Sequence, residues 1–123
     1  MKIFEGSNWG RKINFVDKNN VLVGFDYEQC CCEDFGYNFL NSDKAEIGNN
    51  PDEKTLEPYF FDETFVEYPE TSHCDEGKVR FKLIKRKNDK TPIYLELYNT
   101  HNGYYSHGFE MSKDKTIVHE GSL

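Results

Sequence analysis

The stretch that decides the fold is KINFVDKNNVLVGFDY, residues 12–27. Apolar and polar residues alternate along it with a period of two, which is typical of a β-strand with one buried face. From Asp17 to Asn20 the alternation is interrupted by side chains that favour turns. The sequence therefore predicts a β-hairpin over this stretch.

The length of the hairpin loop follows from where the apolar side chains must point. A three-residue loop from Asp17 to Asn19 pairs Phe15 with Val21 and gathers the apolar residues on one face. A two-residue turn would scatter them, because a slip of one residue moves every side chain to the opposite face. We therefore expect the three-residue loop, with Asn19 in the left-handed conformation.

Further β patterns follow along the chain. Strands are expected at 59–68, 78–87, 93–111 (as a second hairpin) and 116–119. Residues 28–40 break the alternation and suit either a helical turn leading into a strand or an irregular strand. Residues 41–58 predict a long exposed loop, with a helical turn around 52–56. The predicted fold is one domain, 1–123, that is mainly β: an antiparallel hairpin-built sheet or two-layer sandwich of about six strands, with one or two short helices.

The composition limits the location and the partners. The formal net charge of −7 disfavours direct binding to nucleic-acid backbones. No apolar run approaches the ~20 residues that cross a bilayer, so no membrane partner is expected. Residues 1–10 lack the apolar segment of a signal peptide, which predicts a cytoplasmic location. Three of the four cysteines are adjacent, which is a poor disulfide framework, so we expect reduced thiols.

The charge is unevenly distributed along the chain. Residues 43–76 hold eleven acids and two bases, a net charge of −9. Residues 78–90 hold seven bases and one acid, a net charge of +6. One interpretation is two solvated faces that partly neutralise each other. The other is a bipolar surface that steers a charged partner.

The second predicted hairpin, 93–111, carries the candidate site. Its Asn-Gly step is typical of a two-residue turn, but that register would split the apolar side chains between both faces. A three-residue loop, 102–104, pairs Asn99 with His107 and keeps His101 on the same inward face. Inward polar groups need partners, so these side chains either bond to one another and lock the core or form a site.

Two site chemistries are open. Zinc prefers four Cys or His ligands, although the usual two-residue gap within a ligand pair is missing here. The candidate ligands are Cys31, Cys32, His101 and His107. In the alternative, His107 activates Cys31 or Cys32 as the nucleophile, and Asn99 orients the imidazole ring. Nothing marks a nucleophile elbow or a phosphate-binding loop, so no catalytic residue is assigned and no cofactor other than zinc is considered.

Four segments carry a resemblance to known proteins: KINFVD (12–17), VLVGFD (21–26), CCE (31–33) and HNGYYSHGF (101–109). In these segments the chain resembles a family of short uncharacterised proteins from bacteria and their phages. That family has no assigned activity, so the resemblance implies a microbial cytoplasm and a mobile-element origin but no catalytic residues. It marks Cys31, Cys32, Glu33 and the histidine segment as candidates for a binding site or for a core lock.

These observations predict a small acidic cytoplasmic protein that binds a protein partner and is not an enzyme. An acidic surface can occupy a basic site made for nucleic acid, so a phage-related regulator or inhibitor is one version of this function. The alternatives are a zinc-binding protein and a small Cys-His hydrolase. Exposed edge strands also leave a homodimer open.

Overall fold

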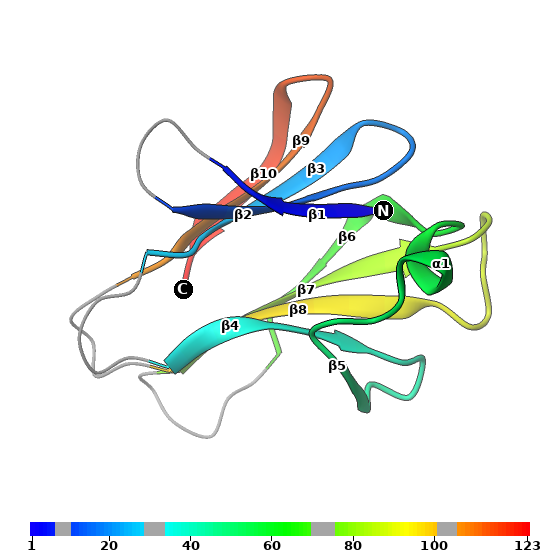
Figure 1. Ribbon diagram of the computed structural model, residues 1–123, viewed down its shortest axis with the longest axis horizontal. Coiled ribbons are helices and arrows are strands. Elements are labelled where there is room, and N and C mark those ends of the chain that lie inside the picture. The colour runs from blue at the N-terminus through cyan, green and yellow to red at the C-terminus, as the bar shows by residue number, and fades with distance from the viewer. Residues whose placement is uncertain (7–10, 29–33, 70–75, 101–105) are drawn as a thin grey trace.

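The computed structural model of the chain describes residues 1–6, 11–28, 34–69, 76–100 and 106–123. Within them lie ten strands and one short helix (Figure 1). The elements in chain order are β1 (Lys2–Glu5), β2 (Lys12–Val16), β3 (Val21–Asp26), β4 (Asp34–Leu40), β5 (Glu46–Gly48), α1 (Glu53–Leu56), β6 (Phe60–Glu67), β7 (Glu76–Ile84), β8 (Ile93–Thr100), β9 (Gly108–Lys113) and β10 (Thr116–Ser122). The mainly β fold predicted from the alternation is confirmed.

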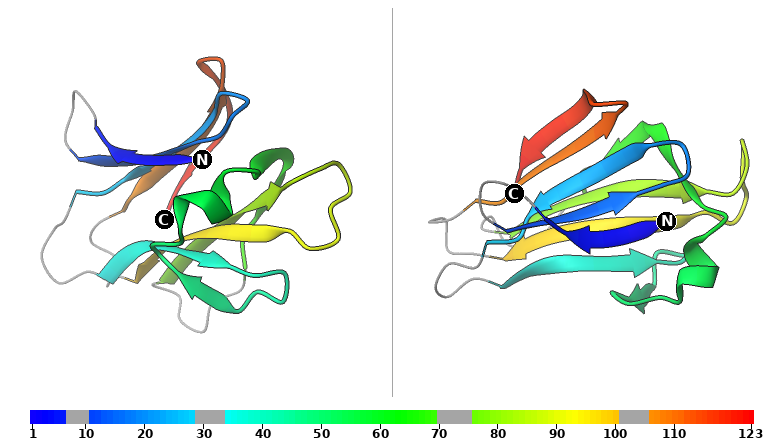
Figure 2. Two further views of the ribbon diagram at one scale, coloured as in Figure 1. Left: turned by 45° about the vertical axis from the view of Figure 1, so that its right-hand side comes forward. Right: turned by 45° about the horizontal axis from the view of Figure 1, so that its top comes forward.

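The strands form two antiparallel sheets that face each other (Figures 1 and 2). The first sheet has the order β1-β2-β3-β9-β10, and the second has the order β5-β4-β8-β7-β6. The arrangement is the two-layer alternative of the prediction, with more strands than expected. The side chains between the sheets form the core, whose fully buried members include Phe15, Phe25, Phe39, Phe81, Leu95, Leu97 and Met111.

The hairpin over residues 12–27 is confirmed, but its register differs from the prediction. Strands β2 and β3 pair antiparallel with Phe15 opposite Val23, where Val21 was expected. The loop does have three residues, but they are 18–20, and Asn20 is the left-handed one, with φ of 61°. Because the shift is two positions, the same side chains still face the core.

The Asp17 carboxylate accounts for the shifted loop and ties the two sheets together. Its Oδ1 accepts the backbone N–H groups of Asn19 and Val21, each at 2.9 Å. Its Oδ2 accepts the N–H of Phe61, in β6 of the second sheet, at 2.8 Å. Asp17 is only 5% exposed, so backbone donors satisfy a carboxylate that the fold has buried.

The predicted second hairpin, 93–111, is wrong. Strand β8 pairs with β4 and β7 in the second sheet, whereas β9 pairs with β3 and β10 in the first. Asn99 therefore lies opposite Phe35 and Gly77, not opposite His107. The inward orientation holds, since Asn99 and His107 are both buried. Alternation determines which side chains turn inward, and two strands facing each other across a sandwich satisfy it as well as a hairpin does.

The remaining segments are resolved as follows. The segment left open at 28–40 contains strand β4, and the expected loop at 41–58 contains β5 and α1. The strands expected at 59–68 and 78–87 are confirmed as β6 and β7, and β10 is longer than the predicted 116–119. In the part of the chain that the structure describes, no helix has the length and apolar character needed to cross a membrane.

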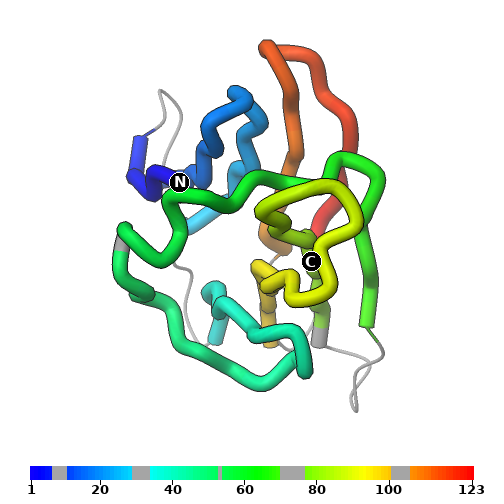
Figure 3. Tube along the Cα trace, turned by 90° about the vertical axis from the view of Figure 1, so that its right-hand side faces the viewer, coloured from blue at the N-terminus to red at the C-terminus, as the bar shows by residue number. Residues whose placement is uncertain are grey.

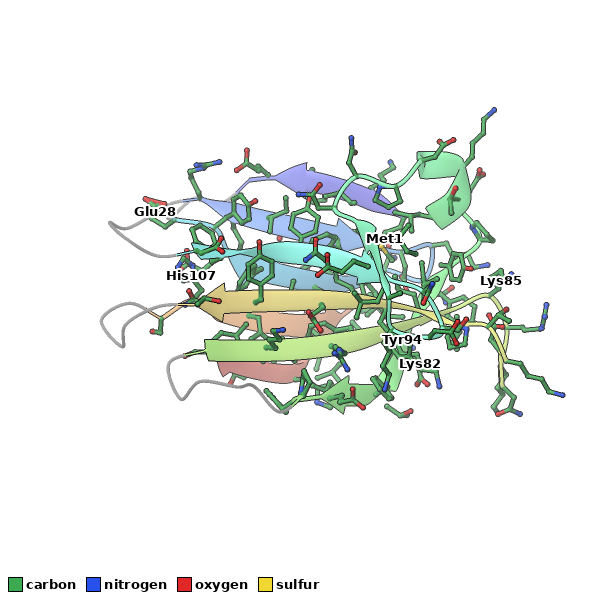
Figure 4. All side chains as sticks on the ribbon, turned by 90° about the horizontal axis from the view of Figure 1, so that it is seen from below. Met1, Glu28, Lys82, Lys85, Tyr94 and His107 are labelled. Atoms are coloured by element: carbon green, nitrogen blue, oxygen red, sulfur yellow. The ribbon has the colours of Figure 1, made fainter. Side chains whose placement is uncertain are left out.

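The sandwich has two distinct ends. The β2–β3, β7–β8 and β9–β10 turns lie at one end, which faces the viewer in Figure 3 and which we call the turn end. The last residues of β3 and β8 and the first residues of β9 lie at the other, which we call the far end. Figure 4 shows Lys85 at the turn end, and Glu28 and His107 at the far end.

Candidate functional site

The predicted site residues divide into two groups. Cys31, Cys32, Glu33 and His101 lie outside the described residues. Their predicted roles as metal ligands, nucleophile or binding groups therefore stay predictions. Asn99 and His107 are described, and both are buried. Asn99 lies next to the last residue of β8, and Figure 4 shows His107 at the same far end.

Asn99 and His107 take part in one set of bonds that joins the two sheets. The Nδ2 group of Asn99, at the end of β8, donates to the carbonyl oxygen of Leu123 at 3.2 Å. The backbone of Leu123 also pairs with that of His107, through N–H···O bonds of 2.9 and 2.8 Å. This is the kind of arrangement that the core-lock interpretation predicts, with buried polar groups bonded to a neighbouring segment.

The His107 ring is held in one orientation and one tautomer. Its Nδ1 lies 2.7 Å from the backbone oxygen of Asp26. A carbonyl oxygen only accepts, so Nδ1 carries a proton and donates it, and in the neutral form of the ring Nε2 is then the nitrogen that accepts. The ring stacks on Phe35 with centroids 4.1 Å apart. At Nδ1, the Asp26 carbonyl performs the orienting role that the Cys-His-Asn hypothesis gave to Asn99.

The structure leaves the predicted zinc site untested. Among the described residues, no three His, Cys, Asp or Glu side chains come together as a metal site. Three of the four predicted ligands lie outside those residues, and His107 alone is described. A histidine that donates its Nδ1 proton to a backbone carbonyl has the tautomer common among zinc-ligating histidines.

A groove that the sequence did not predict lies on the outer face of the first sheet. It has a volume of about 770 Å³ and runs over β2, β3, β9 and β10. Glycines at positions 24, 108 and 121 form part of its lining. The Lys12 side chain crosses over Gly24, where an added Cβ would collide with Cε of that lysine. A side chain at position 24 would therefore displace Lys12 from the groove wall.

Carboxylates outnumber bases in the groove. The four acids are Asp26, Glu28, Glu110 and Glu120, and the two bases are Arg11 and Lys12. Glu110 lies opposite Gly24 in the β3–β9 pairing, so the missing side chain on β3 lets Lys12 cross the strand and reach Glu110. With acids in this excess, the groove is a negatively charged surface.

Both bases of the groove are already paired. Lys12 Nζ lies 2.6 Å from Glu110 Oε1, inside the groove. Arg11 Nη2 lies 2.6 Å from Oε1 of Glu5, which does not line it. The hydrogen bond and the charge of Glu5 raise the pKa of Arg11. The Arg11 guanidinium is therefore bound to a carboxylate outside the groove. Among the described residues, Glu120 has no ion-pair partner.

The groove was missed because the strand pairing was missed. Lys12, Gly24 and Glu110 come from three different strands, and only the β2–β3 and β3–β9 registers bring them together. A hairpin between residues 93 and 111 would have placed Glu110 beside other residues. The visible signal was glycine at an outward position of an otherwise apolar strand, which often marks a close backbone or side-chain approach.

Comparisons with known proteins add a family and no activity. A family described as a domain of unknown function (DUF7448) has a model that matches residues 2–111. No curated protein matches the chain. No solved structure matches it either.

Proposed function

This chain belongs to the DUF7448 family, and from that premise we propose that it is a non-enzymatic protein that binds a protein partner through the groove of the first sheet. The observation that carries the proposal is the charge of the groove. Four carboxylates line it against two bases, and each base is paired with a carboxylate. A cationic side chain on the partner would complete this arrangement.

The shape of the groove supports a macromolecular partner. The groove lies on the face of a sheet, between strands, where a projecting Arg or Lys side chain of another protein has access. Arginine suits it best, because its planar guanidinium bonds two carboxylate oxygens at once.

The proposal includes a more specific version, in which the protein inhibits a nucleic-acid-binding partner. The net charge of −7 supports it, because an acidic surface can take the place of nucleic acid in a basic site. The resemblance to phage proteins also supports it, since a regulator of this kind would suit a phage. Both the bacterial or phage origin and the cytoplasmic location belong to this proposal.

A charge-reversal experiment tests the groove. The wild-type chain serves as bait, and the affinity for the captured and purified partner is then measured by calorimetry at low and high salt. Glu120→Lys is expected to weaken binding by about tenfold or more, equivalent to about 1.4 kcal/mol. Glu57→Lys, an exposed acid outside the groove with the same charge change, is the matched control.

The outcomes separate clearly. Binding that weakens with salt and is lost in Glu120→Lys but not in Glu57→Lys supports the proposal. Equal losses in both variants, binding indifferent to salt, or failure to capture a partner would each contradict it.

A second candidate function, a zinc-binding protein, is favoured by the tautomer of His107. Its Nδ1 donates to the Asp26 oxygen, so Nε2 is the nitrogen with a lone pair, as a zinc ligand requires. The thiolates of Cys31 and Cys32 and the ring of His101 would supply the other ligands of this hypothesis. Metal analysis of protein purified without a histidine tag tests it, and a zinc content near zero ends it.

A further inference from the structure

The β7–β8 turn concentrates positive charge at the turn end of the sandwich. The basic turn, as we call it, consists of Lys85, Arg86, Lys87 and Lys90, which are all exposed. In the described part of the chain, none of these four bases forms an ion pair. Lys85 lies at the opposite end of the molecule from Glu28 of the groove (Figure 4).

The one acid of this segment points inward. Asp89 is 7% exposed, and its Oδ2 accepts the backbone N–H of Lys85 at 2.9 Å. Its Oδ1 accepts the N–H of Thr91 at 3.0 Å. These backbone bonds lower the pKa of Asp89, so it stays ionised while it serves the turn. The Asp89 carboxylate therefore faces the backbone of the turn, while the four bases face solvent.

Aromatic rings hold two lysines at this end. Lys85 Nζ lies 5.6 Å from the ring centroid of Tyr59, and Lys18 Nζ lies 5.2 Å from that of Phe60. Phe60 pairs with Ile84, the residue before Lys85, so Lys18 extends the basic surface beside the turn. Cation–π contacts of this kind restrict the lysine side chains, which reduces the entropy lost when they bind an anion.

We propose that the basic turn binds the phosphate groups of a nucleic-acid backbone without sequence preference. Lys and Arg contacts to phosphate supply essentially all of non-specific nucleic-acid binding. An acidic protein is the weaker alternative, because Lys is depleted at protein interfaces and the turn offers no exposed aromatic or large apolar anchor.

The net charge of the whole chain does not prevent this local contact. A net charge of −7 repels the phosphate backbone when the charge is averaged over the whole molecule, and on that basis no binding to nucleic-acid backbones was expected. The Debye length is about 8 Å at physiological ionic strength, so carboxylates at the far end are largely screened from the turn. We expect weak binding, with Kd of about 10⁻⁴ to 10⁻⁶ M.

Fluorescence anisotropy with a labelled DNA duplex tests the proposal. Each phosphate contact contributes about −0.9 to the slope of log K against log salt, so four bases predict a slope of about −3.6. Lys85→Gln with Lys87→Gln is expected to reduce that slope by about 1.8 and to weaken binding. Lys2→Gln with Lys115→Gln removes two exposed lysines that lie outside the basic turn but at the same end of the sandwich, and is the matched control.

The result that supports the proposal is loss of binding and of slope in the turn variant alone, with the same thermal unfolding midpoint as the wild type. Absence of duplex binding by the wild type at low salt would overturn it. Equal loss in the control would also overturn it, as would tighter binding to polyglutamate than to the duplex, which would point to an acidic protein. The groove is not involved, so this result is independent of the proposed function.

Discussion

The groove at the far end and the basic turn at the turn end both contain acids and bases, but they have opposite charge. In the groove, Lys12 is paired with Glu110, and carboxylates remain in excess. In the turn, the Asp89 carboxylate bonds to backbone N–H groups, and bases remain in excess. Counts of acids and bases give each surface its sign, and the fold strengthens the contrast in the turn by directing its one acid toward the backbone while the bases stay exposed.

The outer face of the second sheet is an intermediate case, in which both signs are used. Glu67, from the acidic stretch 43–76, lies 3.0 Å from Arg80 of the basic stretch 78–90. Glu96 of β8 lies 2.6 Å from the same guanidinium and is buried. Acids therefore neutralise part of the positive charge along β7, as one interpretation of the sequence predicted. The excess of positive charge lies in the turn that follows this strand.

The largest expected effect comes from the other inward carboxylate of the turn end. Asp17→Ala would leave the N–H groups of Asn19, Val21 and Phe61 without their acceptor. We expect a loss of about 3 kcal/mol in the free energy of unfolding. Urea unfolding measures it, as a lower midpoint with an unchanged slope.

Two further variants check that the Asp17 effect comes from the lost bonds. Asp17→Asn keeps one acceptor oxygen and is expected to lose less stability than Asp17→Ala. Asp43→Ala removes an exposed acid and should change stability by less than about 0.5 kcal/mol. A loss of stability for Asp17→Ala no larger than that for Asp43→Ala would show that the hydrogen bonds of the Asp17 carboxylate do not stabilise the fold.

A smaller effect, dependent on pH, is expected for Asp89. The backbone N–H groups of Lys85 and Thr91 lower its pKa in the folded state, whereas in the unfolded chain an aspartate has a pKa of about 3.9. The folded state therefore binds fewer protons than the unfolded state between these values. Asp89 stabilises the fold above about pH 3.9 and loses that contribution as the pH falls through its folded pKa.

Urea unfolding of the wild type and Asp89→Asn from about pH 6 to about pH 2 measures this contribution. The difference in stability should be largest at the upper end and shrink toward acid. Asp114→Asn, in the exposed β9–β10 turn, controls for the change in net charge. A difference that stays constant over the whole range would mean that the charge of Asp89 is not what the turn uses.

The smallest effect is expected for the paired base of the groove. Lys12→Gln removes one positive charge and releases Glu110, so binding of a cationic partner should strengthen by about two- to fivefold. Stability should fall by less than about 1 kcal/mol, since the pair is partly exposed. Calorimetry with the purified partner measures this, with Lys2→Gln as the control, and weaker binding by Lys12→Gln would contradict the assigned sign of the groove.

Alternation predicted much of the fold, because it reports which side chains are buried. It identified the first hairpin, the inward residues of β7, and the inward orientation of Asn99 and His107. It could not identify partners, because Phe109 is equally buried in a hairpin with β8 and in a separate sheet beside Phe25. Strand pairing between distant segments depends on the whole set of competing strands, which a local pattern does not contain.

The candidate surfaces were less predictable than the fold. The groove depends on Gly24 lying opposite Glu110, a contact between residues 86 positions apart in the chain. The turn at 88–92 was expected, but the inward direction of Asp89 was not. Its bond to the N–H of Thr91, two residues on, is typical of an Asx turn, and this signal was present in the sequence.

Nuclear magnetic resonance with a cationic probe addresses the groove without knowledge of the partner. A short arginine peptide is titrated into uniformly ¹⁵N-labelled protein, and the backbone amide signals are followed. The amides of Gly24, Gly108 and Gly121 are predicted to shift most, while those of residues 85–90 stay in place. Larger shifts in the acidic segment 43–57, or no shift at the three glycines, would contradict the assignment of the groove as the binding site.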